Sequence, residues 1–312
     1  MQDSLGDRMK SDFEDRSRIF LPRRSYTIIR CDGKAFHSWV KKQNLIKPFD
    51  DGLMDDMNET AKYLCENISG ARFAFVQSDE ISILITDFEN ESTQAWFDNN
   101  LQKMCSISAS MATSKFNQLR IEGIFEEENA KISGLPPDGH NHTLAYDVLQ
   151  ASFRRFKLAE FDSRVFQIPC RVEVYNYFLW RQQDTTRNSI SSVAQSLYKH
   201  KELEGKNTTE MQEMIFQKGI NWNDYAPKYK RGRMISKEKD KKVLGDLSEK
   251  NKERMEQVMK SNSDYFVNHA KNEFGVNTKI WKVIDVPIFT QDKEFLDHRI
   301  PRNNDDILID NY

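Results

Sequence analysis

The sequence predicts an α+β protein with a ferredoxin-like βαββαβ architecture, in which an antiparallel sheet carries two helices on one face. Two observations support this fold class. Short runs of β-branched and aromatic residues alternate with longer stretches of helical apolar spacing, in the order strand, helix, strand, strand, helix, strand. The second and third strands are separated only by the polar residues 77–80, which indicates a hairpin.

The first half of this pattern follows from apolar spacing and from residues that stop regular structure. Pro22 cannot continue a helix, and Asp32-Gly33 is a typical turn after a strand. The predicted elements are, in order, a helix over 3–24, a strand over 25–31, a loop over 37–51 and a helix over 53–68.

The second half completes the pattern and continues beyond it. It consists of hairpin strands over 73–76 and 81–85, a helix over 93–119, a loop over 123–142 and a strand over 164–168. The remaining chain is predicted to be helical over 171–200 with an interruption at 184–188, mostly helical over 236–272, and strand-like or a packed loop over 281–289. We therefore expect three parts: a sheet region at 1–168, a helical and basic region at 169–240, and a C-terminal extension of unassigned role at 241–312.

The composition describes a globular protein with a charged surface. Of 312 residues, 38% are hydrophobic and 30% are charged, and the formal net charge is −2. A uniformly basic surface is therefore excluded, and a polyanionic partner would need a local patch. The strongest basic run is 228–242, for which a solvated face and a nucleic-acid backbone contact are both open.

The cysteines and the apolar runs bear on the compartment. Four cysteines without a CxxC pair predict reduced thiols rather than a zinc knuckle or a disulfide framework. The chain has neither an apolar leader nor a run of the ~18 apolar residues that a membrane helix needs. We expect a cytoplasmic protein without a membrane partner, with an organelle as the alternative location.

Two carboxylates mark a candidate site. Asp32 ends the first strand, and Asp79 lies in the predicted hairpin connection. In a ferredoxin-like sheet the first strand lies beside this hairpin, so the two side chains would be close together. With a neighbouring backbone carbonyl they would offer the hard oxygen ligands that Mg²⁺ prefers, and two such ions support phosphoryl transfer. Solvated turn residues that bind nothing are the alternative.

Short motifs around these carboxylates occur in order along the chain. They are LGDRMK at 5–10, RCDGKAFH at 30–37, KPFD at 47–50, QSDEIS at 77–82, FDSRV at 161–165 and WRQQD at 180–184. Together they resemble the tRNA(His) guanylyltransferase family, enzymes that add nucleotides in the 3′–5′ direction and are built on a polymerase-type palm. The resemblance extends to about Arg233, makes the sheet region the catalytic palm, and assigns tRNA contacts to the helical and basic region.

The resemblance implies a role for each residue that matches a motif. Asp32, Asp79 and the Gly33 carbonyl would hold metal, and catalysis would involve Asp32, Asp79 and Glu80. Nucleotide contacts would come from Lys34, Phe36, His37, Lys47, Asp50, Ser78 and, by weaker alignment, Lys103. Contacts to tRNA would come from Arg181, Arg187, Asn188, Lys230 and Arg231. For Arg30, structural pairing with a carboxylate and substrate contact are equally open.

The resemblance also implies a reaction and its participants. The chain would be a nucleotidyltransferase that uses two Mg²⁺ ions, takes ATP and GTP or other nucleoside triphosphates as substrates, and has tRNA as its partner. A 5′-monophosphate end would attack the α-phosphate of ATP, and the 3′-hydroxyl of an incoming nucleotide would then displace AMP. Metal ions and basic side chains would neutralise the phosphate charge. The family further suggests a homotetramer.

Two positions depart from the family pattern. Where the eukaryotic enzymes carry His-Ile-Asn-Asn, this chain has Thr-Arg-Asn-Ser at 186–189, and Phe49 replaces an Asn of the nucleotide loop. The first departure resembles the branch that repairs truncated tRNA 5′ ends against a template. Repair is therefore the predicted activity, and addition of a guanylate to tRNA(His) is the alternative. A non-catalytic tRNA-binding protein and a nucleotide cyclase are further alternatives, against which the carboxylate pair and the lack of a cyclase motif argue.

Overall fold

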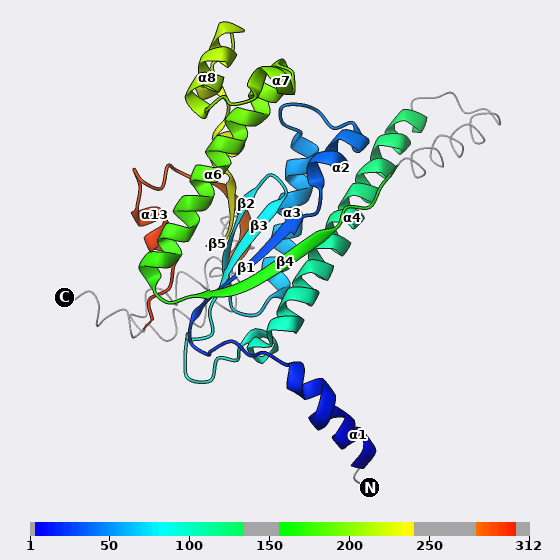
Figure 1. Ribbon diagram of the computed structural model, residues 1–312, viewed down its shortest axis with the longest axis vertical. Helices are drawn as coiled ribbons and strands as arrows, with labels where there is room; N and C mark the ends of the chain where they lie inside the picture. Colours follow the sequence, from blue (N-terminus) through cyan, green and yellow to red (C-terminus); the bar gives the residue numbers. More distant parts are fainter. Residues whose placement is uncertain (1–3, 134–155, 240–278, 304–312) are drawn as a thin grey trace, which may run out of the picture.

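The computed structural model describes residues 4–133, 156–239 and 279–303. Within them the chain forms a six-stranded antiparallel sheet of order β4-β1-β3-β2-β5-β6 (Figure 1). The strands are β1 (Tyr26–Gly33), β2 (Ala71–Gln77), β3 (Glu80–Ile85), β4 (Phe161–Ile168), β5 (Arg233–Lys239) and β6 (Lys279–Asp285). The first four strands have the order of a ferredoxin-like unit, which confirms the predicted α+β class.

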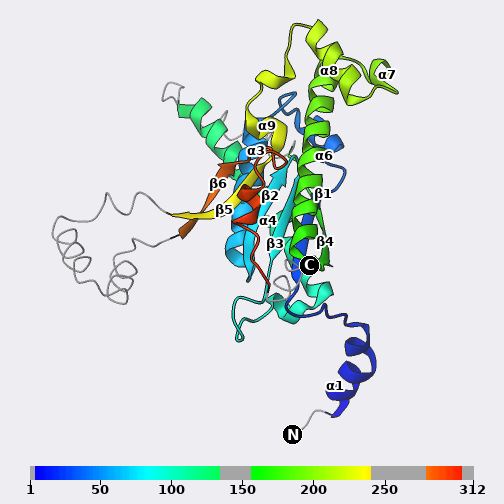
Figure 2. The ribbon, with the colours of Figure 1, turned by 90° about the vertical axis from the view of Figure 1, so that its left-hand side faces the viewer.

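Helices cover both faces of the sheet (Figure 2). The larger helices are α2 (Phe36–Gln43), α3 (Asp51–Asn67) and α4 (Leu101–Ser133) on one face and α6 (Arg171–Leu197) on the other. The shorter helical segments are α1 (Ser4–Met9), η1 (Lys10–Glu14), η2 (Asp15–Ser17), η3 (Trp96–Asn99), α7 (His200–Leu203), α8 (Thr208–Gln217), η4 (Trp222–Asp224), α9 (Pro227–Arg231) and α13 (Glu294–Asp297). Among the described helices, none has the length and apolar character that crossing a bilayer requires.

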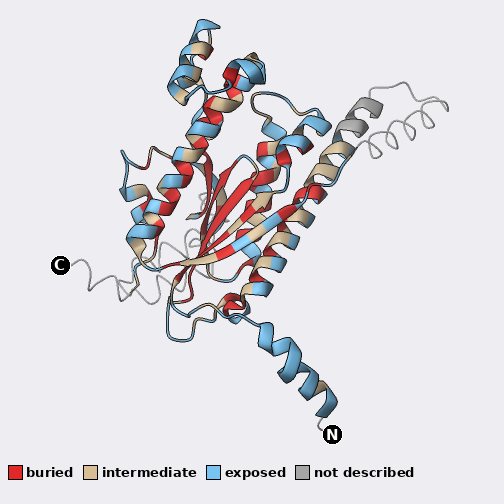
Figure 3. Ribbon diagram, in the orientation of Figure 1, coloured by how far each residue is buried: buried red, intermediate tan, exposed pale blue. Residues whose placement is uncertain are grey.

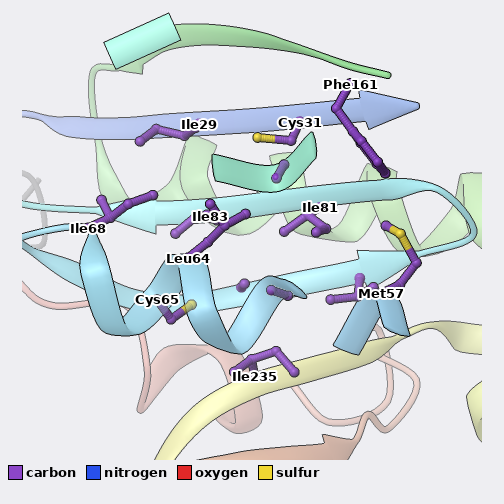
Figure 4. Close-up of a cluster of buried hydrophobic side chains, with 14 of the residues drawn as sticks. Ile29, Cys31, Met57, Leu64, Cys65, Ile68, Ile81, Ile83, Phe161 and Ile235 are labelled. Carbon is purple, nitrogen blue, oxygen red and sulfur yellow. The ribbon is translucent and has the colours of Figure 1, made fainter. Parts of the chain in front are cut away.

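Successive side chains of each strand point to opposite faces of the sheet and pack into two separate hydrophobic cores. On β1, Ile29 and Cys31 pack with α3 and α4, whereas Tyr26 and Ile28 pack with α6 and with the segment that follows β6. Figure 4 shows the first of these cores, and Figure 3 shows that the central strands are buried. These strands are rich in apolar residues because both of their faces are covered.

The stretch predicted as a loop over 37–51 contains helix α2. Phe36, Trp39 and Val40 have the i, i+3, i+4 spacing of a helical stripe, and the two aromatic side chains are buried in the first core. The lysines at 41–42, which favoured a loop, lie in the last turn of the helix, where they complement its dipole.

Two predicted breaks in helices are wrong. α4 continues to Ser133 through part of the loop predicted at 123–142, whose remainder lies outside the described residues. α6 is unbroken at 184–188. There the hydroxyls of Thr185 and Thr186 donate to backbone carbonyls one turn earlier, at 2.8 and 3.1 Å, so these polar residues fit within the helix.

β5 and β6 extend the sheet beyond the four predicted strands. The helix predicted from residue 236 is wrong as far as 239, because this part of the basic run forms β5 beside β2. Met234 and Ile235 enter opposite cores, a strand alternation that the surrounding lysines and arginines obscure in the sequence. β6 agrees with the strand-like character of 281–289, whereas 240–278 lie outside the described residues. Elsewhere, the N-terminal helical segments end at Ser17, before Pro22.

The aromatic cluster around Phe116 tests the first core. Phe116 is fully buried on α4, with ring centroids 5.7, 5.6 and 5.3 Å from those of Phe36, Trp39 and Phe161. We expect Phe116→Ala to lower the free energy of unfolding by about 3–5 kcal/mol because it leaves a cavity. Urea denaturation measures the loss. Ile107→Ala, at a 39% exposed position of the same helix, is the control and should cost less than about 1 kcal/mol. Equal losses would contradict this core.

Candidate active site

The two predicted carboxylates meet where β1 ends beside the turn between β2 and β3. Asp32 pairs with Glu80 in the antiparallel register of β1 and β3. The backbone N–H of Gly33 donates to the carbonyl of Asp79 at 3.1 Å. The turn is tight, and its Ser78 has a φ of +45°. Asp32 and Asp79 are therefore neighbours in space, as the predicted topology requires.

Burial and nearby carboxylates raise the pKa values of both aspartates. The pKa of Asp79 is raised to about 6, chiefly because burial disfavours the charged form, and the charges of Asp32 and Glu80 add to this. The pKa of Asp32 is also raised, mainly by burial, and the charge of Arg30 offsets part of the effect. Two adjacent carboxylates that resist ionisation form a site that favours a bound cation.

The donor atoms of this site fit a Mg²⁺ ion that takes part of its ligands from a bound substrate. Gly33 keeps the site open, because a Cβ atom there would lie 2.9 Å from Oδ2 of Asp79 and closer still to the ring of Phe36. In the described ranges no group of three or more His, Cys, Asp or Glu side chains could hold a metal. Magnesium suits the smaller donor set, because it binds through one or two carboxylates and completes its shell with waters and phosphate oxygens.

Glu80 forms a buried ion pair with Arg181 of α6. Nη1 of Arg181 donates to Oε2 of Glu80 at 2.7 Å, and the two side chains are 5% and 10% exposed. The hydroxyl of Ser82 donates to the other carboxylate oxygen at 3.1 Å. The tRNA contact predicted for Arg181 is corrected accordingly, because its guanidinium faces inward and holds α6 against the sheet. A catalytic role for Glu80 stays a prediction.

A pocket of about 460 Å³ opens beside Asp79, a volume typical of small-molecule sites. Its walls come from α2, the loop before α3, the turn between β2 and β3, α6, and the segment from α9 to β5. The predicted nucleotide and tRNA contacts that line it are Phe36, His37, Lys47, Asp50, Ser78 and Asn188. The fold thus gathers residues from distant motifs around one cavity.

Local contacts shape the wall of this pocket. The carboxylate of Asp50 accepts from the backbone N–H groups of Leu53 at 2.8 Å and of Ile46 at 3.0 Å. It therefore caps α3 and ties the preceding loop to it. Phe49 stacks on Tyr229 with ring centroids 4.7 Å apart, which joins this loop to α9.

Two predicted nucleotide contacts do not line the pocket. Lys34 is exposed and pairs with Glu160 at 2.6 Å. Lys103 lies near the start of α4, where the N–H of Leu101 donates to the carbonyl of Ile19 at 2.9 Å, just before β1. The pocket lies at the other end of β1. Lys103 therefore does not line this pocket, and its nucleotide contact stays a prediction.

The remaining predicted tRNA contacts divide by exposure. Arg187 is exposed and pairs with Asp184 at 2.8 Å, and Arg231 is half-buried. Lys230 is buried, and its ammonium donates to the backbone carbonyl of Asn223. Lys230 is thus corrected to a structural residue, whereas tRNA contacts by Arg187 and Arg231 stay predictions.

The sequence interpretation missed several polar residues on the pocket wall, among them Gln77, Thr185 and Arg233. The side chains of Thr185 and Gln77 are hydrogen-bonded, which links α6 to β2. Arg233 appeared to be one more cation in a basic run. The only signal that set it apart was its position next to Met234 and Ile235, where the run becomes apolar.

Comparison with known proteins places the site in a family. A family model described as tRNA(His) guanylyltransferase matches residues 6–169, which include both aspartates. The chain belongs to the tRNA(His) guanylyltransferase family. It is therefore a nucleotidyltransferase, like the relatives that carry this name. The tRNA(His) guanylyltransferase of Debaryomyces hansenii is 27% identical over 81% of this chain and 91% of its own, and that of Saccharomyces cerevisiae is 27% identical over 70% and 85%.

Solved structures extend the similarity beyond the matched residues. A bacterial tRNA(His) guanylyltransferase-like protein in complex with ATP is 37% identical, with a TM-score of 0.66 over 95% of this chain and 99% of its own. A complex with GTP, likewise of a bacterial guanylyltransferase-like protein, is 35% identical, with a TM-score of 0.65 over 96% and 99%. The family likeness thus covers the pocket residues of α6 and β5 as well as the palm.

The raised pKa of Asp79 predicts how stability depends on pH. A carboxyl with a higher pKa in the folded state destabilises the fold as pH rises from 3.8 through about 6. We expect Asp79→Asn to raise the free energy of unfolding of the metal-free protein by roughly 1–2 kcal/mol at pH 8 and by less at pH 4. Denaturation in a chelator at both pH values measures this. Asp12→Asn, on the exposed N-terminal segment, is the control, and an equal gain at both pH values would refute the assignment.

The ion pair between Glu80 and Arg181 predicts a second stability effect. Arg181→Met leaves a buried, unpaired carboxylate, so we expect it to lower the free energy of unfolding by about 3–5 kcal/mol. Combining it with Glu80→Leu should restore much of this loss, as thermal or urea denaturation would show. Arg187→Met, exposed on the same helix, should cost less than about 1 kcal/mol. An Arg181→Met variant as stable as the wild type but weaker in tRNA binding would reinstate the original tRNA contact.

Proposed function

We propose that this chain adds nucleotides to the 5′ end of tRNA in the 3′–5′ direction and that it repairs truncated ends against a template. The observation that carries the proposal is the pair Asp32 and Asp79 beside a pocket whose wall also bears His37 and Lys47. Relatives 35–37% identical to nearly the whole chain are bound to ATP and GTP, which supports a nucleoside triphosphate as the occupant.

The proposed reaction has two phosphoryl-transfer steps. An oxygen of the tRNA 5′-phosphate attacks the α-phosphorus of ATP, and pyrophosphate leaves. The 3′-hydroxyl of the incoming nucleotide then attacks the 5′-phosphorus of the activated end and loses its proton, and AMP leaves. Mg²⁺ held by Asp32, Asp79 and the Gly33 carbonyl would neutralise phosphate charge and lower the pKa of the attacking hydroxyl. His37 and Lys47 are positioned to orient the nucleotide in the pocket.

Two observations favour repair over tagging of tRNA(His). The segment 186–189 lacks the His-Ile-Asn-Asn motif of the eukaryotic enzymes, and its Asn188 lines the pocket. Identity is also higher to the bacterial guanylyltransferase-like protein, at 37%, than to the yeast enzymes, at 27%. Addition of a guanylate to tRNA(His) is the second candidate, because the curated relatives carry that name.

Three further properties belong to the same proposal. The regions 1–168 and 169–240 act together, since both supply residues to one pocket. A homotetramer and a cytoplasmic location follow from the family resemblance. Gel filtration with light scattering would test the homotetramer, and imaging of a tagged chain would test the cytoplasmic location.

The activity is tested with 5′-labelled truncated tRNAs that carry matched or mismatched bases opposite the added position. We expect extension with Mg²⁺, ATP and the complementary nucleotide, and at least about 100-fold slower addition for a mismatch. Asp32→Ala and Asp79→Ala should each slow extension by more than about 100-fold, because transition-state charge loses its counter-ion.

Glu59→Ala, on an exposed turn of α3, is the matched control and should retain wild-type activity. Extension that adds only guanylate, only to tRNA(His) and regardless of the opposing base, would favour the second candidate. No extended product from folded protein would refute both.

A further inference from the structure

Arg233 reaches the pocket through the geometry of the strand that carries it. It is the first residue of β5 and pairs with Val76 of β2, so both side chains lie on the face covered by α3. The preceding Gly232 has a φ of +79°, and a Cβ atom there would lie 2.9 Å from the carbonyl oxygen of Val76. This close approach turns the chain from α9 into β5 and places Arg233 on the same wall as Ser78 and Asp79.

The guanidinium of Arg233 is buried, and none of the described residues is its anionic partner. Its side chain is 3% exposed, and Nε donates to Oδ1 of Asn58 at 2.7 Å. Nη2 has no hydrogen-bond partner. In the described part of the chain no carboxylate forms an ion pair with Arg233, although Asp55 exerts a longer-range attraction. Arg181, which is similarly buried, has Glu80 as its counter-ion.

An uncompensated buried cation is costly, because the charge loses its hydration and gains nothing in return. Burial lowers the pKa of Arg233 to about 10, which still leaves the side chain charged at neutral pH. The neighbouring cation Lys228 is already paired with Asp51 at 2.6 Å. Arg233 is therefore a charged donor on the pocket wall whose requirement for an anion is unmet among the described residues.

We infer that Arg233 is a phosphate-binding residue of this pocket, and that its guanidinium donates to a phosphate oxygen of the bound substrate. Guanidinium groups match phosphate in charge and geometry, and a desolvated site strengthens such a bond. The phosphate comes either from a nucleoside triphosphate or from the 5′ end of an RNA. The inference rests on the proposed function for the substrate class, but its evidence is the unpaired charge.

Arg233→Gln tests the inference, because glutamine keeps an amide donor for Asn58 and removes the charge. Titration calorimetry on the full chain without metal would use inorganic tripolyphosphate, and a short oligoribonucleotide with either a 5′-phosphate or a 5′-hydroxyl. We expect a ~10- to 100-fold weaker affinity for at least one phosphate ligand and no change for the 5′-hydroxyl oligonucleotide. A weaker affinity for tripolyphosphate identifies a nucleoside triphosphate as the source of the bound phosphate. A weaker affinity for the 5′-phosphorylated oligoribonucleotide identifies the RNA as the source.

Lys237→Gln is the matched control, because it removes the same charge from an exposed position of β5 that does not line the pocket. Its affinities should stay within about twofold of the wild type. A structural role for Arg233 would instead make Arg233→Gln less stable. If Arg233 instead serves to bind phosphate, the ligand-free Arg233→Gln variant should unfold at the same temperature as the wild type or at a higher one, because a buried unpaired charge is removed.

Unchanged affinity of Arg233→Gln for both phosphate ligands would overturn the inference. If this variant does not fold, Arg233→Lys replaces it, and the loss of the planar donor pair should weaken phosphate binding by about 5- to 10-fold. Unchanged affinity there would have the same consequence. If the wild type extends tRNA but Arg233→Gln binds both phosphate ligands as tightly as the wild type, only the inference about Arg233 is refuted. If phosphate binding depends on Arg233 but the wild type extends no tRNA, only the proposed function is refuted.

Discussion

The register between β1 and β3 is the constraint on which the site depends. It aligns Asp32 with Glu80, and the bond from the N–H of Gly33 to the carbonyl of Asp79 ties the end of β1 to the adjacent turn. Because side chains alternate along a strand, a slip of one residue would move Asp32 to the opposite face and exchange the two cores. The buried alternation of Ile28 and Ile29 therefore specifies the position of the carboxylates as well as the stability of the sheet.

Charge is distributed unevenly around the pocket. Glu80 is neutralised by Arg181, whereas Asp32 and Asp79 repel each other and have raised pKa values. On β5, beside β2 in the same sheet, Arg233 is a cation without a counter-ion among the described residues. The described residues around the pocket thus carry uncompensated charge of both signs, an arrangement that a metal-bound polyphosphate would neutralise. Sites of this kind sacrifice stability of the free protein for complementarity to a ligand.

The pocket also explains why the chain extends beyond a four-stranded palm. β5 and β6 widen the sheet, and β5 brings Arg233 to the wall of the pocket. α6 covers the second face and supplies Asn188 and Thr185 to the same cavity. The stacked rings of Phe49 and Tyr229 join the loop before α3 to α9. The helical region is therefore part of the site rather than a separate attachment to it.

The sequence by itself determined the order of the first four strands and the hairpin, because apolar period and turn residues are local properties. The ferredoxin-like topology that this order implies then gave the proximity of Asp32 to Asp79. It also carried the motifs of the family. Only the tertiary structure decided which charged residues lack an ion-pair partner and which lie near the pocket. Arg181 is paired with Glu80, 101 positions away, and Lys103 lies near the end of β1 that is farther from the pocket. Arg233 acquires its character in the same way. Burial and pairing arise from contacts between distant segments, which local composition does not encode.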